Sequence, residues 1–218
     1  MPLLVAFVVG WLVAGGAGDV HSQAVDGVRP LQGVARSQLA SILPSDATLL
    51  DDPAAIEAFL EALDGHPPDW AALYGHEGSH HDERLFALNR ERDRLREGRP
   101  ALQQRLTFVW AGELSDYDPF MAGFRVAVGP EMIATRWGLV RFKPDDLPSP
   151  LVAVPSPSAR EALRRQRAKG QRVEVAVAMT GRLVPEESLI YDFAHEEAGR
   201  GLVMPVVRIE RLDYLMVL

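Results

Sequence analysis

The stretch that decides the fold is Val173-Glu174-Val175-Ala176-Val177-Ala178-Met179-Thr180. Its larger apolar residues stand at every second position, which is the period of a β-strand with one face in a hydrophobic core. Similar apolar stretches recur after residue 104, and they cover residues 105–111, 124–128, 140–143, 151–154, 189–191 and 207–216. We therefore expect residues 101–218 to form a β-rich domain.

The final apolar stretch changes parity within its length. Val207 and Ile209 share one face of the expected strand, whereas Leu212 and Tyr214 fall on the other face. One extra residue in a strand produces such a change, so we predict a β-bulge near residues 210–211.

One helix is expected inside the β-rich domain, over residues 158–169. Ser158 and Glu161 match a capping box, and Gly170 suits the left-handed residue that ends a helix. The resulting order places a helix between strands three and four, as in a five-stranded Greek-key barrel of the OB type. Another β-rich α+β sheet with one crossover helix fits nearly as well. The predicted fold class is therefore α+β, with the OB-like barrel as one of two alternatives.

The part before the β-rich domain is expected to be a helical segment over residues 51–100. Its first helix covers residues 52–64 and carries one apolar stripe at helical spacing, made of Ile56, Phe59, Leu60 and Leu63. Its second and longest helix covers residues 80–97, and the residues expected on its buried side are Leu85, Leu88 and Leu95. The mixed-sign run at residues 90–94 is typical of a solvated helix face.

The N-terminus has the pattern of an export signal. Residues 2–18 carry no charged side chain, and an apolar run is followed by the small residues that a signal peptidase accepts. We expect residues 1–24 to be a signal peptide or a short anchor, residues 25–50 to be a linker, and the protein to be periplasmic or secreted. The chain contains no cysteine, so its stability depends on its core rather than on disulfides.

The helix expected over residues 158–169 carries the one concentrated basic patch of the sequence. Its cations are Arg160, Arg164, Arg165, Arg167 and Lys169. Such a helix is typical of a solvated surface or of a contact with an anionic lipid, an acidic glycan or an acidic envelope protein. Nucleic acid is an unlikely partner because the net charge is −7. The leading hypothesis is a soluble binding or envelope-associated module without catalytic activity.

Two further groups are weaker candidates for binding. Trp137 and Arg141 are expected on an exposed face of the β-rich domain. Tyr191, Asp192 and His195 are expected near a strand end, where they would form a polar rim of a binding site. No phosphate-binding loop, dinucleotide fingerprint or calcium-binding loop occurs, so the sequence implies no cofactor.

The alternative hypothesis is a zinc-dependent hydrolase. The string His76-Glu77-Gly78-Ser79-His80 reads as H-E-x-x-H, in which two histidines on successive helical turns hold zinc and the glutamate activates a water molecule. However, Ser79 is a good N-cap for the helix that follows, and a cap at this position would leave His76 outside the helix. The non-catalytic interpretation is therefore preferred.

Overall fold

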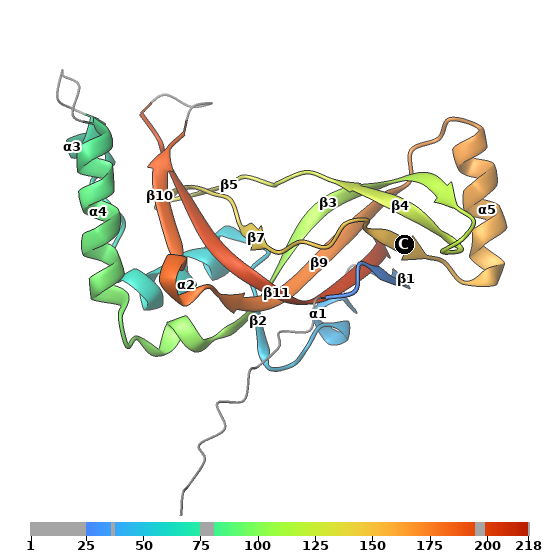
Figure 1. Ribbon diagram of the computed structural model, residues 1–218, viewed down its shortest axis with the longest axis horizontal. Helices are drawn as coiled ribbons and strands as arrows, with labels where there is room; N and C mark the ends of the chain where they lie inside the picture. Colours follow the sequence, from blue (N-terminus) through green and yellow to red (C-terminus); the bar gives the residue numbers. More distant parts are fainter. Residues whose placement is uncertain (1–24, 36–37, 75–80, 195–198, 218) are drawn as a thin grey trace, which may run out of the picture.

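The computed structural model describes residues 25–35, 38–74, 81–194 and 199–217. The chain is an α+β protein in which a strongly twisted sheet closes into a barrel (Figure 1). Helix α4 (His81–Arg96) stands at one end of the elongated molecule and helix α5 (Pro157–Ala168) at the other. No helix among these described residues is long and apolar enough to cross a membrane.

Six strands form the closed ring of the barrel. In order around the ring they are β1 (Val28–Val34), β8 (Val152–Val154), β4 (Gly123–Val128), β3 (Arg105–Asp118), β9 (Glu174–Leu183) and β11 (Gly201–Val217). Neighbours in the ring are antiparallel, except that β1 runs parallel to both β8 and β11. A β-barrel is thus confirmed, but the five-stranded Greek-key order of an OB barrel is not.

The segment at residues 25–50 is part of the sheet, which corrects the expectation of a linker. Strand β1 closes the ring, and after the short helix α1 (Leu39–Ile42), strand β2 (Ala47–Leu49) pairs in parallel with β3. Both strands are short, and β1 is mostly exposed or half-buried along its length. Only a few of their side chains, such as Leu31, Val34 and Leu49, pack on apolar clusters, so these strands lack the apolar alternation that reveals a strand in a sequence.

The barrel core consists of the alternating residues that the sequence indicated. Leu106, Phe108 and Trp110 of β3 face inward, as do Val177 and Met179 of β9, and all of them are buried. Large side chains from different parts of the sequence meet there, as when the ring of Phe108 stacks on that of Phe142 at 4.7 Å between centroids.

Strand β11 contains the predicted bulge. Ile209 pairs with Gly181 of β9, and Arg211 pairs with the preceding Thr180, so Glu210 is the extra residue. The N-terminal part of β11 extends beyond the ring. Its partners there are β6 (Gly138–Val140), β7 (Lys143–Asp145) and β10 (Leu189–Phe193), and β5 (Ile133–Thr135) pairs with β6.

Helix α2 (Pro53–Asp64) follows the prediction closely. The side chain of Asp52 accepts hydrogen bonds from the backbone N–H groups of Ala54 and Ala55, at 2.8 and 3.0 Å. The four residues of the apolar stripe are all buried. Gly65 ends the helix with a φ of 86°, which glycine adopts without steric cost. A short helix, α3 (Trp70–Tyr74), follows it.

Helix α4 has the predicted extent, but its buried side differs from the prediction in the C-terminal half. Leu85 and Leu88 are half-buried and pack against the core. Leu95 is 53% exposed, whereas Arg92 and Arg96 are buried. The predicted buried side is therefore correct for Leu85 and Leu88 and wrong for Leu95, and the run at residues 90–94 is not wholly solvated. The reason is a buried carboxylate, that of Asp64, which lies opposite the two arginines.

Helix α5 begins earlier than predicted. Its N-cap is Ser156, whose hydroxyl accepts a hydrogen bond from the backbone N–H of Ala159 at 3.3 Å, and Pro157 occupies the first helical position. The predicted capping box of Ser158 and Glu161 is therefore wrong, because Ser158 lies inside the helix. Gly170 has the predicted left-handed backbone after the helix, with a φ of 73°.

Candidate binding site between helix α5 and the β3–β4 hairpin

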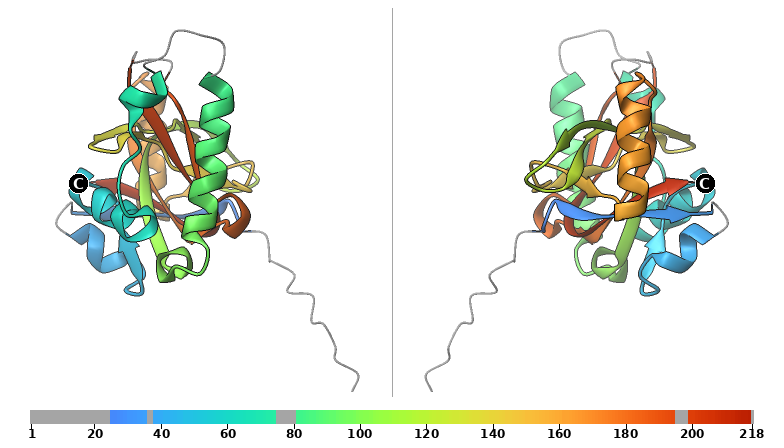
Figure 2. Two further views of the ribbon diagram at one scale, coloured as in Figure 1. Left: turned by 90° about the vertical axis from the view of Figure 1, so that its left-hand side faces the viewer. Right: turned by 90° about the vertical axis from the view of Figure 1, so that its right-hand side faces the viewer.

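A pocket of about 390 Å³ lies between helix α5 and the hairpin formed by β3 and β4. Its walls bring together Ser115, Asp116 and Tyr117 of the hairpin with Arg164, Arg165 and Arg167 of the helix. Figure 2 shows α5 standing beside the hairpin at this end of the molecule. Three of the five cations predicted from the sequence therefore line one pocket.

Helix α5 is attached to the barrel by two apolar side chains, Leu163 and the half-buried Ala159, and by a few polar contacts. Leu163 is the only buried residue of the helix. The guanidinium of Arg167 lies 3.1 Å from the carboxylate of Glu113 in β3. The guanidinium of Arg164 lies 5.0 Å from the ring centroid of Tyr117, which is a cation–π contact. The hairpin thus holds the pocket wall in place while most of the helix surface faces solvent.

Much of the positive charge of α5 is not neutralised. Arg164 lies 3.7 Å from Glu161, but both side chains are more than half exposed, so this pair is weak. Arg165 and Lys169 are exposed and form no ion pair with any residue that the structure describes. Arg160 is half-buried, and its Nε has no hydrogen-bond partner in the described chain. The exposed side of the helix can therefore attract an anion.

An apolar tip projects from the same hairpin. Phe120 is 99% exposed and Met121 is 37% exposed, both in the turn that joins β3 to β4. The side chain of Asp118 accepts hydrogen bonds from the backbone N–H groups of Phe120 and Met121, at 3.0 and 3.2 Å. The turn is thus held in shape and presents an aromatic ring to solvent.

Trp137 and Arg141 do not form the exposed face that we predicted. Trp137 is completely buried in the hydrophobic core, and its backbone carbonyl accepts a hydrogen bond from the indole N–H of Trp70 at 2.7 Å. Arg141 is half-buried, with its guanidinium 3.1 Å from the sulfur of Met204. Neither residue lies at the α5 pocket.

The predicted polar rim is not a surface site either. Tyr191 is buried in the core, and Asp192 is half-buried and accepts a hydrogen bond from the backbone N–H of Phe193 at 2.8 Å. His195 lies outside the described residues. Strand β10, which carries Tyr191 and Asp192, lies at the end of the molecule opposite α5 (Figure 1).

The predicted zinc ligands His76, Glu77 and His80 also lie outside the described residues. Among the residues with described positions, no three histidine or acidic side chains come close enough together to hold a metal ion.

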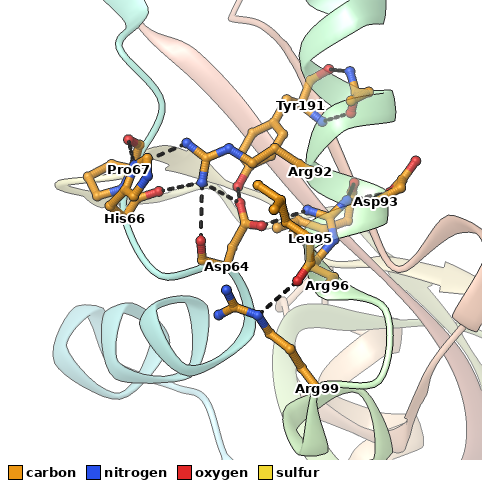
Figure 3. A network of polar contacts seen from close by, with 11 residues as sticks. Asp64, His66, Pro67, Arg92, Asp93, Leu95, Arg96, Arg99 and Tyr191 are labelled. Atoms are coloured by element: carbon orange, nitrogen blue, oxygen red, sulfur yellow. Dashed lines mark hydrogen bonds and ion pairs between the residues drawn. The ribbon is translucent and has the colours of Figure 1, made fainter.

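A buried polar network, absent from the sequence-based predictions, joins α2, α4 and β10 (Figure 3). The carboxylate of Asp64 lies 3.1 Å from Arg92 and 3.3 Å from Arg96, and it accepts a hydrogen bond from the hydroxyl of Tyr191. Burial and the nearby carboxylate raise the pKa of Tyr191 far above its ordinary value. All four side chains are shielded from water, so this network holds the fold together rather than binding a ligand.

One signal in the sequence was available for this network. Arg92 and Arg96 are four residues apart, so they lie on one face of a helix, and Asp64 ends the preceding amphipathic helix. The pattern does not distinguish a buried arginine pair from a solvated one.

The α5 pocket is therefore where the described residues bring together cations, an aromatic ring and a neighbouring apolar tip. The chain matches no family model, no curated protein and no solved structure.

Proposed function

We propose that this protein is an exported binding module without catalytic activity, and that it binds an anionic ligand through helix α5. The observation that carries the proposal is the pocket between α5 and the hairpin, whose wall holds three arginines and two acidic residues, Asp116 and Glu161. Arg167 is paired with Glu113 and Arg164 only weakly with Glu161, and Arg165 forms no ion pair within the described residues. The overall charge of −7 would repel anions from the rest of the surface, so a local basic face has to provide the attraction. Export is proposed from the apolar N-terminal sequence.

An anionic membrane surface is the ligand that we favour over an acidic glycan. Basic side chains attract anionic headgroups, and an exposed aromatic residue beside them inserts into the boundary between headgroups and acyl chains. Phe120 and Met121 supply such an apolar tip on the hairpin that also forms the α5 pocket. A soluble glycan would give this tip no apolar surface to contact.

Vesicle co-sedimentation tests the proposal. The purified protein is mixed with vesicles of neutral lipid alone, or of neutral lipid with phosphatidylglycerol, at low and high salt. We expect binding only to the anionic vesicles, and loss of binding in about 0.5 M salt because charges are then screened. The double variant Arg164→Glu/Arg165→Glu should bind at least ~10-fold more weakly, since each cation near an anionic surface contributes about 1 kcal/mol.

A matched control separates the α5 site from general electrostatics. Arg90 and Arg94 are also exposed, and they lie on helix α4 at the other end of the molecule. The variant Arg90→Glu/Arg94→Glu carries the same charge change and should bind like the original protein. Equal losses in both double variants, or no binding to anionic vesicles at low salt, would contradict a membrane site on α5.

The tip variant Phe120→Ser/Met121→Ser distinguishes lipid from glycan. For a membrane ligand, this variant should bind anionic vesicles more weakly but should retain its affinity for soluble dextran sulfate. The other outcome is that neither the α5 variant nor the tip variant changes vesicle binding, while the α5 variant no longer binds dextran sulfate. In that case the ligand is a soluble polyanion rather than a membrane.

A zinc-dependent hydrolase stays a second proposal. It is supported by ring contacts between residues close to the alternative zinc ligands His76 and His80. The ring of Tyr74 packs on Phe193 at 4.6 Å between centroids, and the ring of His81 lies 6.1 Å from Phe193. Tyr74 and His81 border the segment at residues 75–80, and Phe193 lies two residues before the segment at residues 195–198. The described residues next to the two segments are therefore in contact with each other. Stoichiometric zinc in the purified protein, lost in a His76→Ala/His80→Ala variant, would support this proposal, and zinc far below one equivalent would end it.

A further inference from the structure

Strand β3 has an open edge between two of its neighbours. On one side β9 pairs along Arg105–Glu113. On the other side β2 pairs with Arg105–Thr107, and β4 pairs with β3 from Gly112 onward. Among the described residues, the stretch Phe108–Ala111 therefore has no strand partner on that second side. The edge of a strand presents backbone N–H and C=O groups that can pair with another chain.

The direction of the unpaired backbone groups follows from a neighbouring contact. The carbonyl of Thr107 accepts a hydrogen bond from Leu50 N–H at 2.8 Å, so it points toward the open side. Backbone groups alternate in direction along a strand, and Val109 and Ala111 therefore turn their N–H and C=O groups to the same side. Val109 is half-buried and Ala111 is exposed.

A groove of about 850 Å³ lies at this part of β3. Its walls are Val109–Glu113 of β3, residues 127–131 at the end of β4 and beyond it, Arg172, and Glu174–Ala176 at the start of β9. Small residues such as Ala111, Gly112 and Ala176 leave space along it. The volume is typical of a ligand-binding site.

The groove wall also holds a hydrogen-bond donor without an acceptor. Trp110 lines the groove and is 7% exposed, and its indole N–H has no partner in the part of the chain that the structure describes. Because the indole faces the barrel core and this nitrogen is shielded, Trp110 can report binding in the groove through its fluorescence but is not a contact for the bound chain.

The charge around the groove favours a basic occupant. Three glutamates line it, Glu113, Glu131 and Glu174, against one cation, Arg172. Glu113 is partly neutralised, because it pairs with Arg167 at 3.1 Å. Glu131 and Glu174 are exposed and form no ion pair within the described residues. The groove thus has the opposite charge preference to helix α5.

We propose that an extended peptide segment of a partner protein, with small apolar residues alternating with lysine or arginine, adds to β3 as a strand at Phe108–Ala111. The backbone of β3 would supply hydrogen bonds, the groove would receive alternate side chains, and Glu131 and Glu174 would select the basic ones. This interaction is independent of ligand binding at α5.

Hydrogen exchange and peptide binding test the proposal. The probe is a short peptide of alternating valine and lysine, blocked at both ends, and its controls are a valine–glutamate peptide and an N-methylated valine–lysine peptide. In the free protein the amides of Val109 and Ala111 should exchange quickly. The valine–lysine peptide should slow their exchange and change the fluorescence of Trp110, whereas both control peptides should not.

Surface charge variants supply the decisive comparison, because they leave the barrel core untouched. Glu131→Lys/Glu174→Lys should weaken binding of the valine–lysine peptide roughly 5- to 10-fold, as expected for two exposed ion pairs, and should allow the valine–glutamate peptide to bind. Arg164→Glu/Arg165→Glu should bind the valine–lysine peptide like the original protein. Three results would overturn the proposal: slow exchange of both amides in the free protein, binding of the N-methylated peptide, or unchanged binding after the glutamate changes. The proposal would also be wrong if sedimentation showed that the amides are protected only because the protein self-associates.

Discussion

The hydroxyl of Tyr191 donates a hydrogen bond to the buried carboxylate of Asp64, which lies 127 residues earlier in the chain. The same carboxylate faces the guanidinium groups of Arg92 and Arg96. The side chain of Asn89 strengthens this junction, because it bonds to both the N–H and the C=O of Tyr191, at 2.8 and 2.9 Å. Helix α4 is thus fastened to β10 and α2 by buried polar groups as well as by Leu85 and Leu88, which pack against the core.

Removing the charge of Asp64 should be severely destabilising. The variant Asp64→Asn would leave two buried arginines with too little negative charge, and breaking a buried ion pair in this way costs about 3–5 kcal/mol. Urea unfolding at neutral pH measures the loss. Glu91→Gln, at an exposed position of the same helix, is the control and should change the free energy of unfolding by less than about 0.5 kcal/mol. A similar small effect at Asp64 would mean that the network is not essential for the fold.

Stability should fall in alkaline solution because of two buried tyrosines. Burial raises the pKa of Tyr191 and also that of Tyr214, whose hydroxyl donates to the carbonyl of Gly27 at 2.8 Å. In the unfolded chain both would ionise near pH ~10, so above that pH the unfolded state binds fewer protons than the folded state and stability decreases. Phenolate absorbance should show that these two tyrosines ionise only together with the loss of circular dichroism. Their ionisation in a fully folded chain would contradict the prediction.

Gly201 should tolerate no side chain, because Trp70 lies against it. A Cβ atom at Gly201 would lie 1.9 Å from the indole ring of Trp70, whose N–H is hydrogen-bonded and whose ring packs on Tyr191. We expect Gly201→Ala to cost about 2–3 kcal/mol through overpacking. Gly129→Ala meets no atom within 4 Å and is the matched control. Thermal unfolding of the two variants checks this, and equal midpoints would show that Trp70 moves aside freely.

The start of helix α5 can be tested by two serine changes. Ser156→Ala should destabilise the protein by about 1 kcal/mol, since it removes the hydroxyl that caps the helix. Ser158→Ala should be close to neutral, because Ser158 is exposed within the first turn and does not cap the helix. Chemical denaturation of both variants gives the comparison. A larger loss at Ser158 would restore the cap position that the sequence pattern suggested.

Much of the secondary structure was predictable because local patterns report local burial. The alternation at residues 173–180 predicted β9, the stripe from Ile56 to Leu63 predicted α2, and the parity change predicted the bulge at Glu210. The basic residues of the candidate site were also predictable, because they lie together on one helix.

The pocket itself, its apolar tip at Phe120 and the open edge of β3 were not predictable, since they depend on which distant segments meet. A hydrophobic pattern records that a residue is buried but not which residue covers it. Trp137 illustrates this limit, because we predicted it on an exposed face and it lies in the core, among residues from distant parts of the chain.

The amino-acid sequence by itself therefore determined the α+β class, most element positions and the basic character of α5. Only the tertiary structure decided that the barrel has six strands, that β1 closes it, and that Arg92 and Arg96 are buried. The physical reason is that an arginine is buried only when a carboxylate such as Asp64 lies within reach, and that contact arises when the chain has folded.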